Sequence, residues 1–336
     1  MEAPKTKTQS LPPPPGIIGS LRAGFDAVAS HITAILLPLA LDALLWLGPR
    51  LSVQNLFQPL IEQANRDVAS SGLPADQMQV ILNVYKTIAA GLGQYNLLST
   101  LRTFPIGITS LMVGKMPTYS PLGAPAMIQV FSFGEMIGWI GLLTLFGWIG
   151  GSLYFYWVAR VAASEAETKT ASAGQAVLQT IFLSILWTAL LFAIALPGSF
   201  VLSVLYLISP LLAQGAILVL ILIAMWLIVP VFFSPHGIFV RRQNAFASIF
   251  TSLRFARFTL PTSSLFVFSI FFIAEGLNLL WRVPPDNSWM TAVGILGHAF
   301  VTTALLAASF VYYRDMNAWL ETVFERLKAG AATPPA

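Results

Sequence analysis

From Pro210 to Phe233 the chain runs for 24 residues without a charged side chain. At 1.5 Å per residue, a helix of this length covers about 36 Å, enough to cross the roughly 30 Å hydrocarbon core of a bilayer. Comparable runs recur along the chain, and only 10% of its 336 residues are charged, against about 25% in a soluble domain. The sequence therefore predicts an integral membrane protein.

Six segments are long and apolar enough to cross the bilayer. They cover roughly residues 27–47, 131–158, 176–196, 210–233, 262–281 and 289–313. Pro197 and Gly198 are expected to end the third of them, because proline interrupts a helix. The prediction is an all-α bundle of six transmembrane helices over residues 21–315, with a helical insertion at 50–125.

The second predicted span is rich in glycine. Gly134 and Gly138, and again Gly147 and Gly151, are four residues apart. This spacing lets the backbones of neighbouring membrane helices approach closely, so we expect this helix at the centre of the bundle.

Residues 50–125 differ from the rest because they carry many charges. Apolar residues recur there at helical spacing, which predicts two amphipathic helices lying on the membrane surface or capping the bundle. Within this region 97–112 is more apolar but holds Arg102, Pro105 and Gly107. That composition is typical of a re-entrant or interfacial piece more than of a full span.

The basic residues of the loops predict the orientation of the chain. Twelve lysines and arginines fall on the side of the two termini, whereas the two short loops on the opposite side carry only Arg282. The positive-inside rule then places both termini in the cytoplasm and the insertion outside, in a bacterial cytoplasmic membrane. The cytoplasmic parts would include a disordered, proline-rich tail at 1–20 and an amphipathic helix with its tail at 316–336.

The stretch between Pro230 and Pro261 is the most basic part of the chain and has no acidic residue. From Asn244 onward its apolar residues recur at helical spacing, which predicts a basic helix lying on the cytoplasmic leaflet between the fourth and fifth spans. It is either a plain topological anchor or a specific site for anionic lipids or a partner. The candidate lipid contacts are Arg241, Arg242, Arg254 and Arg257. Nucleic acid is not expected, because the basic residues sit at the ends of apolar runs.

Six polar residues fall in the outer half or near the middle of the predicted spans. They are Asp42, Glu135, Gln214, Glu275, Asn278 and His298. Polar groups in hydrocarbon usually face the bundle interior or a cavity. One hypothesis is an outward-facing polar cavity, with Glu275 and His298 as its ionisable pair, in a transporter or permease for a small polar solute. Alternatively, Asp42 and Glu135 sit at the water interface, and Glu275 pairs with Arg282 or His298 for packing.

Signals for an enzyme are missing from the sequence. The chain has no cysteine, and its three histidines lie on separate segments without metal-ligand spacing. No phosphate-binding loop with a lysine and no nucleophile motif occurs either. We therefore expect no catalytic site, metal or cofactor, and a scaffold or accessory protein that contacts membrane lipids and other membrane proteins.

Three stretches carry a family resemblance: LRAGFDAVASHITAILLPLALDALLWL at 21–47, RQNAFASIFTSLRFARF at 242–258 and ASFVYYRDMNAWLE at 308–321. In these the chain resembles the membrane domain attached to some bacterial glycerophosphodiester phosphodiesterases, and related membrane families. The soluble phosphodiesterase barrel is missing here, so the resemblance implies no hydrolase activity. It implies an integral membrane protein with an accessory or scaffolding role.

Overall fold

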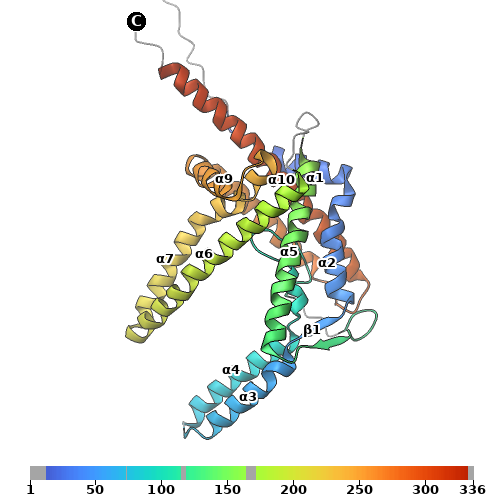
Figure 1. Ribbon diagram of the computed structural model, residues 1–336, viewed down its shortest axis with the longest axis vertical. Helices are drawn as coiled ribbons and strands as arrows, with labels where there is room; N and C mark the ends of the chain where they lie inside the picture. Colours follow the sequence, from blue (N-terminus) through green and yellow to red (C-terminus); the bar gives the residue numbers. More distant parts are fainter. Residues whose placement is uncertain (1–12, 73, 115–118, 164–171, 332–336) are drawn as a thin grey trace, which may run out of the picture.

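The computed structural model describes residues 13–72, 74–114, 119–163 and 172–331. Within these ranges the chain is a helical bundle with one small sheet (Figure 1). The all-α prediction is confirmed. Residues 1–12 of the predicted tail and the last five residues lie outside the described part.

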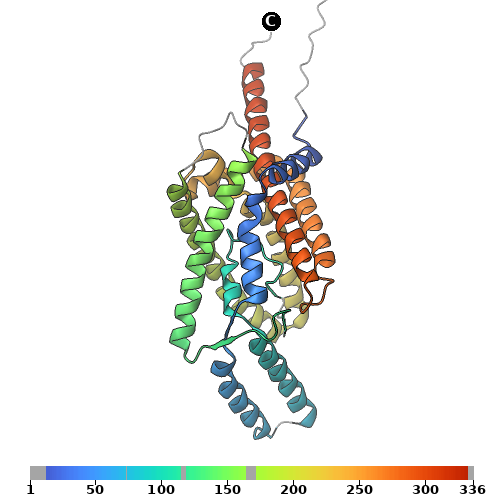
Figure 2. The same ribbon diagram turned by 90° about the vertical axis from the view of Figure 1, so that its right-hand side faces the viewer.

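Five helices are long and apolar enough to cross a membrane. They are α5 (Phe133–Ala162), α6 (Ala173–Ile208), α7 (Pro210–Phe233), α9 (Ala245–Trp281) and α10 (Met290–Ala331). A sixth crossing can be made by α1 (Ile17–Ser30) with η1 (Ile32–Ile35) and α2 (Leu36–Leu47), which are bent by 96°. The bend falls at His31, whose backbone leaves helical geometry. As a result α1 crosses the end of the bundle while α2 runs along it (Figure 2).

Three helices are longer than the sequence predicts. Helix α6 continues through Pro197, and α9 continues through Pro261, so the basic helix and the fifth span are one element. The prediction of a separate surface helix there is wrong. Buried side chains on both sides of Pro261, such as Phe255 and Phe266, pack into one core cluster, and this burial outweighs the lost backbone hydrogen bond. Helix α10 likewise runs on past the predicted span.

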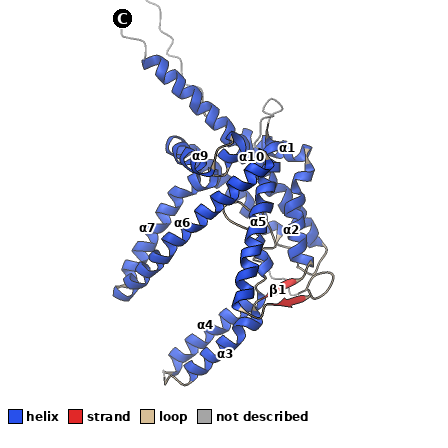
Figure 3. Cartoon of the chain, viewed as in Figure 1, coloured by secondary structure: helices blue, strands red, loops and turns tan. Residues whose placement is uncertain are grey.

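The insertion contains the two predicted helices and projects from one end of the bundle. Helices α3 (Gln54–Ala69) and α4 (Ala75–Gln94) form a pair that extends beyond the end of α5 (Figures 1 and 2). They face each other across a groove lined by Phe57, Ile61, Ala89 and Leu92, which lets each helix cover apolar surface of the other. Two short parallel strands, β1 (Arg50–Ser52) and β2 (Met127–Gln129), pin the two ends of the insertion together (Figure 3).

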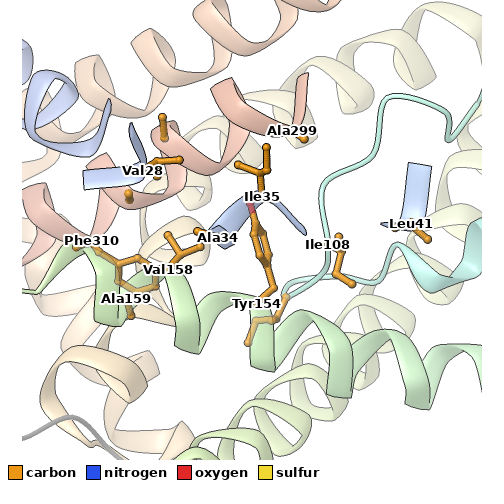
Figure 4. Close-up of a cluster of buried hydrophobic side chains, with 14 of the residues drawn as sticks. Val28, Ala34, Ile35, Leu41, Ile108, Tyr154, Val158, Ala159, Ala299 and Phe310 are labelled. Carbon is orange, nitrogen blue, oxygen red and sulfur yellow. The ribbon is translucent and has the colours of Figure 1, made fainter. Parts of the chain in front are cut away.

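Helix α10 is the most buried of the long helices, and the α6–α7 hairpin is the most exposed. In its most apolar window α10 has 72% of its residues buried, whereas α6 has none. The main hydrophobic cluster joins α10 to α1, α2 and α5 through residues such as Phe310, Ala299 and Tyr154 (Figure 4). The α6–α7 hairpin diverges from this core and leaves most of residues 189–228 exposed (Figure 1).

Candidate functional site

A non-helical segment lies inside the bundle. After the short helix η2 (Leu97–Leu101) the backbone is irregular as far as Gly114, and Ile106, Leu111 and Met112 on it are buried. Its Thr109 hydroxyl is 2.9 Å from that of Thr302, about 18 Å along α10 from Met290. Because strands β1 and β2 hold the two ends of the insertion together, the segment enters and returns on the same side. We call residues 102–114 the re-entrant segment.

Two glycines of α5 pack directly against this part of the chain. A Cβ at Gly151 would lie 2.8 Å from the Cα of Gly107, and one at Gly147 would lie 2.6 Å from the carbonyl oxygen of Leu101. The predicted close approach therefore occurs, but to the re-entrant segment and the end of η2 and not to another membrane-crossing helix. At Gly134 and Gly138 a Cβ would have nothing within 4 Å, so the backbone of α5 is open there.

Asp42 holds the tip of the re-entrant segment to α2. Its carboxylate accepts hydrogen bonds of 3.0 Å from the backbone N–H groups of Leu111 and Met112, and one from the Ser110 hydroxyl. The side chain is fully buried, so the prediction that it sits at the water interface is wrong. Irregular backbone at membrane depth is tolerated where protein satisfies its polar groups, and this carboxylate satisfies two of them.

The other predicted polar residues do not converge. His298 on α10 donates from Nδ1 to the Asn278 side-chain oxygen on α9 at 2.8 Å, and both residues are buried. Glu275 lies one turn before Asn278 but is exposed, and no pairing with His298 or Arg282 is seen for it among the described residues. The structure therefore pairs His298 with the amide and not with the carboxylate.

Glu135 and Gln214 lie near helix ends. Glu135 accepts a hydrogen bond from the Phe131 backbone N–H, and its own N–H donates to Ser132 at the start of α5. This reciprocal arrangement caps the helix. Gln214 is exposed, one turn into α7.

The four arginines divide into two groups. Arg241 pairs with Glu321 of α10, and Arg242 follows it in a left-handed conformation that ends α8 (His236–Arg241). Arg254 and Arg257 instead line a groove between α7 and α9, together with Trp226, Leu253 and Phe258. Trp226 was not among the predicted contacts, although its place near the end of an apolar run is typical of an interfacial anchor.

Further polar pairs in the core also escaped the sequence analysis. Tyr154 bonds to Thr303 at 2.9 Å, and His236 bonds to Ser309 at 2.7 Å. Thr302, Thr303 and Ser309, which are polar residues inside an apolar run of α10, could have indicated these pairs. These pairs join helices to α10, and among the described residues no group of three metal-ligating side chains is found.

Comparisons of the chain with models of protein families, with curated proteins and with solved structures find no match. The resemblance to the phosphodiesterase-linked membrane domain therefore stays a prediction. Three features of the structure remain to be interpreted: the hydrogen-bonded polar pairs of the core, the exposed apolar α6–α7 hairpin, and the groove that Arg254 and Arg257 line.

Proposed function

We propose that this chain is a non-enzymatic scaffold or accessory component of a bacterial cytoplasmic membrane, with both termini in the cytoplasm. The arrangement of the bundle supports this orientation: α1 and the C-terminal part of α10 lie at one end, and the α3–α4 pair lies at the other (Figure 1). The first end carries the arginines of α8 and α9, which the positive-inside rule assigns to the cytoplasm.

The observation that carries the scaffold role is the exposure of the α6–α7 hairpin. Both helices are apolar on all sides, and they diverge from α5 away from the basic end (Figure 1). The outer half of α5 is exposed too, including Ile137, Ile140 and Leu142. We assign these surfaces to a transmembrane helix of another membrane protein, which would pack closely where Gly134 and Gly138 leave the α5 backbone open.

The internal polar groups support the same role. The Asp42 carboxylate accepts hydrogen bonds from backbone N–H groups, and His298 is hydrogen-bonded to Asn278. These residues therefore hold the bundle together. The transporter hypothesis depended on Glu275 and His298 acting as a pair in one cavity. Glu275 instead lies on the exposed surface of α9, which removes the support for a transport path at this place.

The substitution Gly138→Leu tests the scaffold role. Since nothing lies within 4 Å of a Cβ there, G138L is expected to fold normally, while the added side chain would push a partner helix away. The assay is the mass of the assembly extracted in mild detergent from native membranes. The wild type should run above one 36.4 kDa chain, and G138L should run as the single chain.

The matched control is Gly276→Leu on α9, where a Cβ also has nothing within 4 Å. This variant should keep the larger assembly. A wild-type protein that runs as a single chain with lipid alone, or an equal effect of both leucines, would refute the scaffold role.

A further inference from the structure

A groove of about 440 Å³ joins α7 to α9 at the basic end of the bundle. Two arginines and three apolar side chains line it: Arg254, Arg257, Trp226, Leu253 and Phe258. A smaller groove of about 130 Å³ shares Arg254 and Phe258 with it and reaches Phe324 of α10. We call the first of these the α7–α9 groove. Its composition, with charge at one wall and apolar surface at the other, is that of a site for an amphiphile.

The two arginines of the α7–α9 groove have no ion-pair partner among the described residues, although Glu321 lines the smaller groove together with Arg254. Glu321 pairs with the nearby Arg241. The Arg254 guanidinium lies 5.7 Å from the centre of the Phe324 ring, and the Arg257 guanidinium lies 5.8 Å from the centre of the Phe258 ring. Contact with a ring face orients a guanidinium and leaves the N–H groups at its edge available to an anion.

The apolar wall of the groove continues along the membrane-facing surface of α7. Leu218, Leu222 and Trp226 follow one another at four-residue spacing, and each is more than half exposed. These residues share one face of the helix and form a stripe about 12 Å long that leads away from the arginines. An acyl chain bound there would leave the headgroup region and enter the hydrocarbon layer.

We infer that the α7–α9 groove binds one anionic phospholipid. Arg254 and Arg257 donate to the phosphate and the headgroup, and an acyl chain lies along the stripe on α7. Arginine suits this role because its planar N–H groups match phosphate oxygens in pairs, and Trp226 sits at the level where aromatic side chains meet headgroups. A soluble phosphate would use the arginines and leave the apolar wall uncovered, so the composition of the groove favours a lipid. Both proposals use exposed surface of α7, but their tests are separate, since the scaffold role is tested at Gly138 on α5 and the lipid site at the two arginines of α9.

The test measures lipid binding to the full chain in an uncharged detergent. Phosphatidylglycerol or phosphatidylcholine is added in increasing amounts, and native mass spectrometry counts the lipids bound per chain. The wild type should bind one phosphatidylglycerol tightly and phosphatidylcholine weakly. R254Q/R257Q should lower the affinity for phosphatidylglycerol about thirty-fold, which corresponds to about 1 kcal/mol for each arginine. The variant R254K/R257K keeps the positive charges but lacks the planar guanidinium groups, so its loss of affinity for phosphatidylglycerol should be intermediate.

The control R66Q/K86Q removes two charges from exposed positions on α3 and α4, at the opposite end of the bundle (Figure 1). It should change the affinity less than about three-fold, because distant charges are screened by the solvent. An equal loss in both double variants would mean diffuse attraction, and a wild type without preference for phosphatidylglycerol would mean no site. Either result overturns the inference.

Two further measurements separate a lipid from a soluble anion. Glycerol phosphate, which has the headgroup charge and no chains, should compete only weakly, and competition equal to that of the lipid would overturn the inference. Phosphatidylglycerol brominated in its chains, at one lipid per protein, should quench a fluorescence component that W226F removes. W289F, at an exposed tryptophan next to α10, should leave that component in place. Unchanged quenching in W226F would show that no chain lies on the stripe.

Discussion

Replacing Asp42 by asparagine is expected to release the re-entrant segment. The carboxylate accepts two backbone N–H bonds of 3.0 Å and a third bond from Ser110. An amide has one acceptor oxygen and turns an NH₂ group toward donors that remain buried. Losing one or two charge-assisted bonds at about 1.5–3 kcal/mol each outweighs the relief from burying a neutral group, so D42N should cost about 2–4 kcal/mol.

The loss can be measured in two ways in detergent. The free energy of unfolding should fall by that amount. A thiol introduced by Ile108→Cys, at a buried position in a chain that has no other cysteine, should become reactive only in the D42N background. D26N is the control, because the Asp26 carboxylate is 72% exposed and 3.7 Å from Arg22, so it should cost less than about 0.5 kcal/mol. Unchanged stability in D42N, together with an unreactive thiol in the variant that carries both substitutions, would show that the carboxylate does not hold the segment.

Three other tests address the packing and the topology. Gly151→Val should cost about 1–3 kcal/mol, because its Cβ meets the Gly107 Cα, whereas Gly141→Val, with nothing within 4 Å, should leave the thermal midpoint nearly unchanged. Asn278→Leu should cost about 1–3 kcal/mol by orphaning the buried Nδ1–H of His298, and Glu275→Gln on the exposed face should cost less than about 0.5 kcal/mol; equal costs would contradict the pairing. Single cysteines introduced in place of Ser70 and Ser172 should react with impermeant reagents from opposite sides of the membrane, and labelling from one side would overturn the proposed orientation.

Local sequence rules succeed here for the class of fold, fail at two prolines and are incomplete at one glycine pair, each for a particular reason. Pro197 and Pro261 looked like helix ends, but α6 and α9 continue through them. At Pro261 the apolar side chains that are buried on both sides outweigh the missing N–H bond. Gly147 and Gly151 correctly indicated a close approach, yet the spacing alone could not say that the approaching backbone is irregular. The polar residues were identified, while their partners were not.

The long apolar runs by themselves determined that this chain forms membrane-crossing helices, since a bilayer leaves an uncharged stretch of that length few other structures. The charges of the loops predicted which ends share a side. Only the tertiary structure decided that Asp42 binds the backbone near Ser110, 68 residues away, and that His298 meets Asn278 instead of Glu275. These contacts depend on how helices rotate and cross, and a pattern of hydrophobicity, which fixes a helix face only within a broad arc, does not encode them.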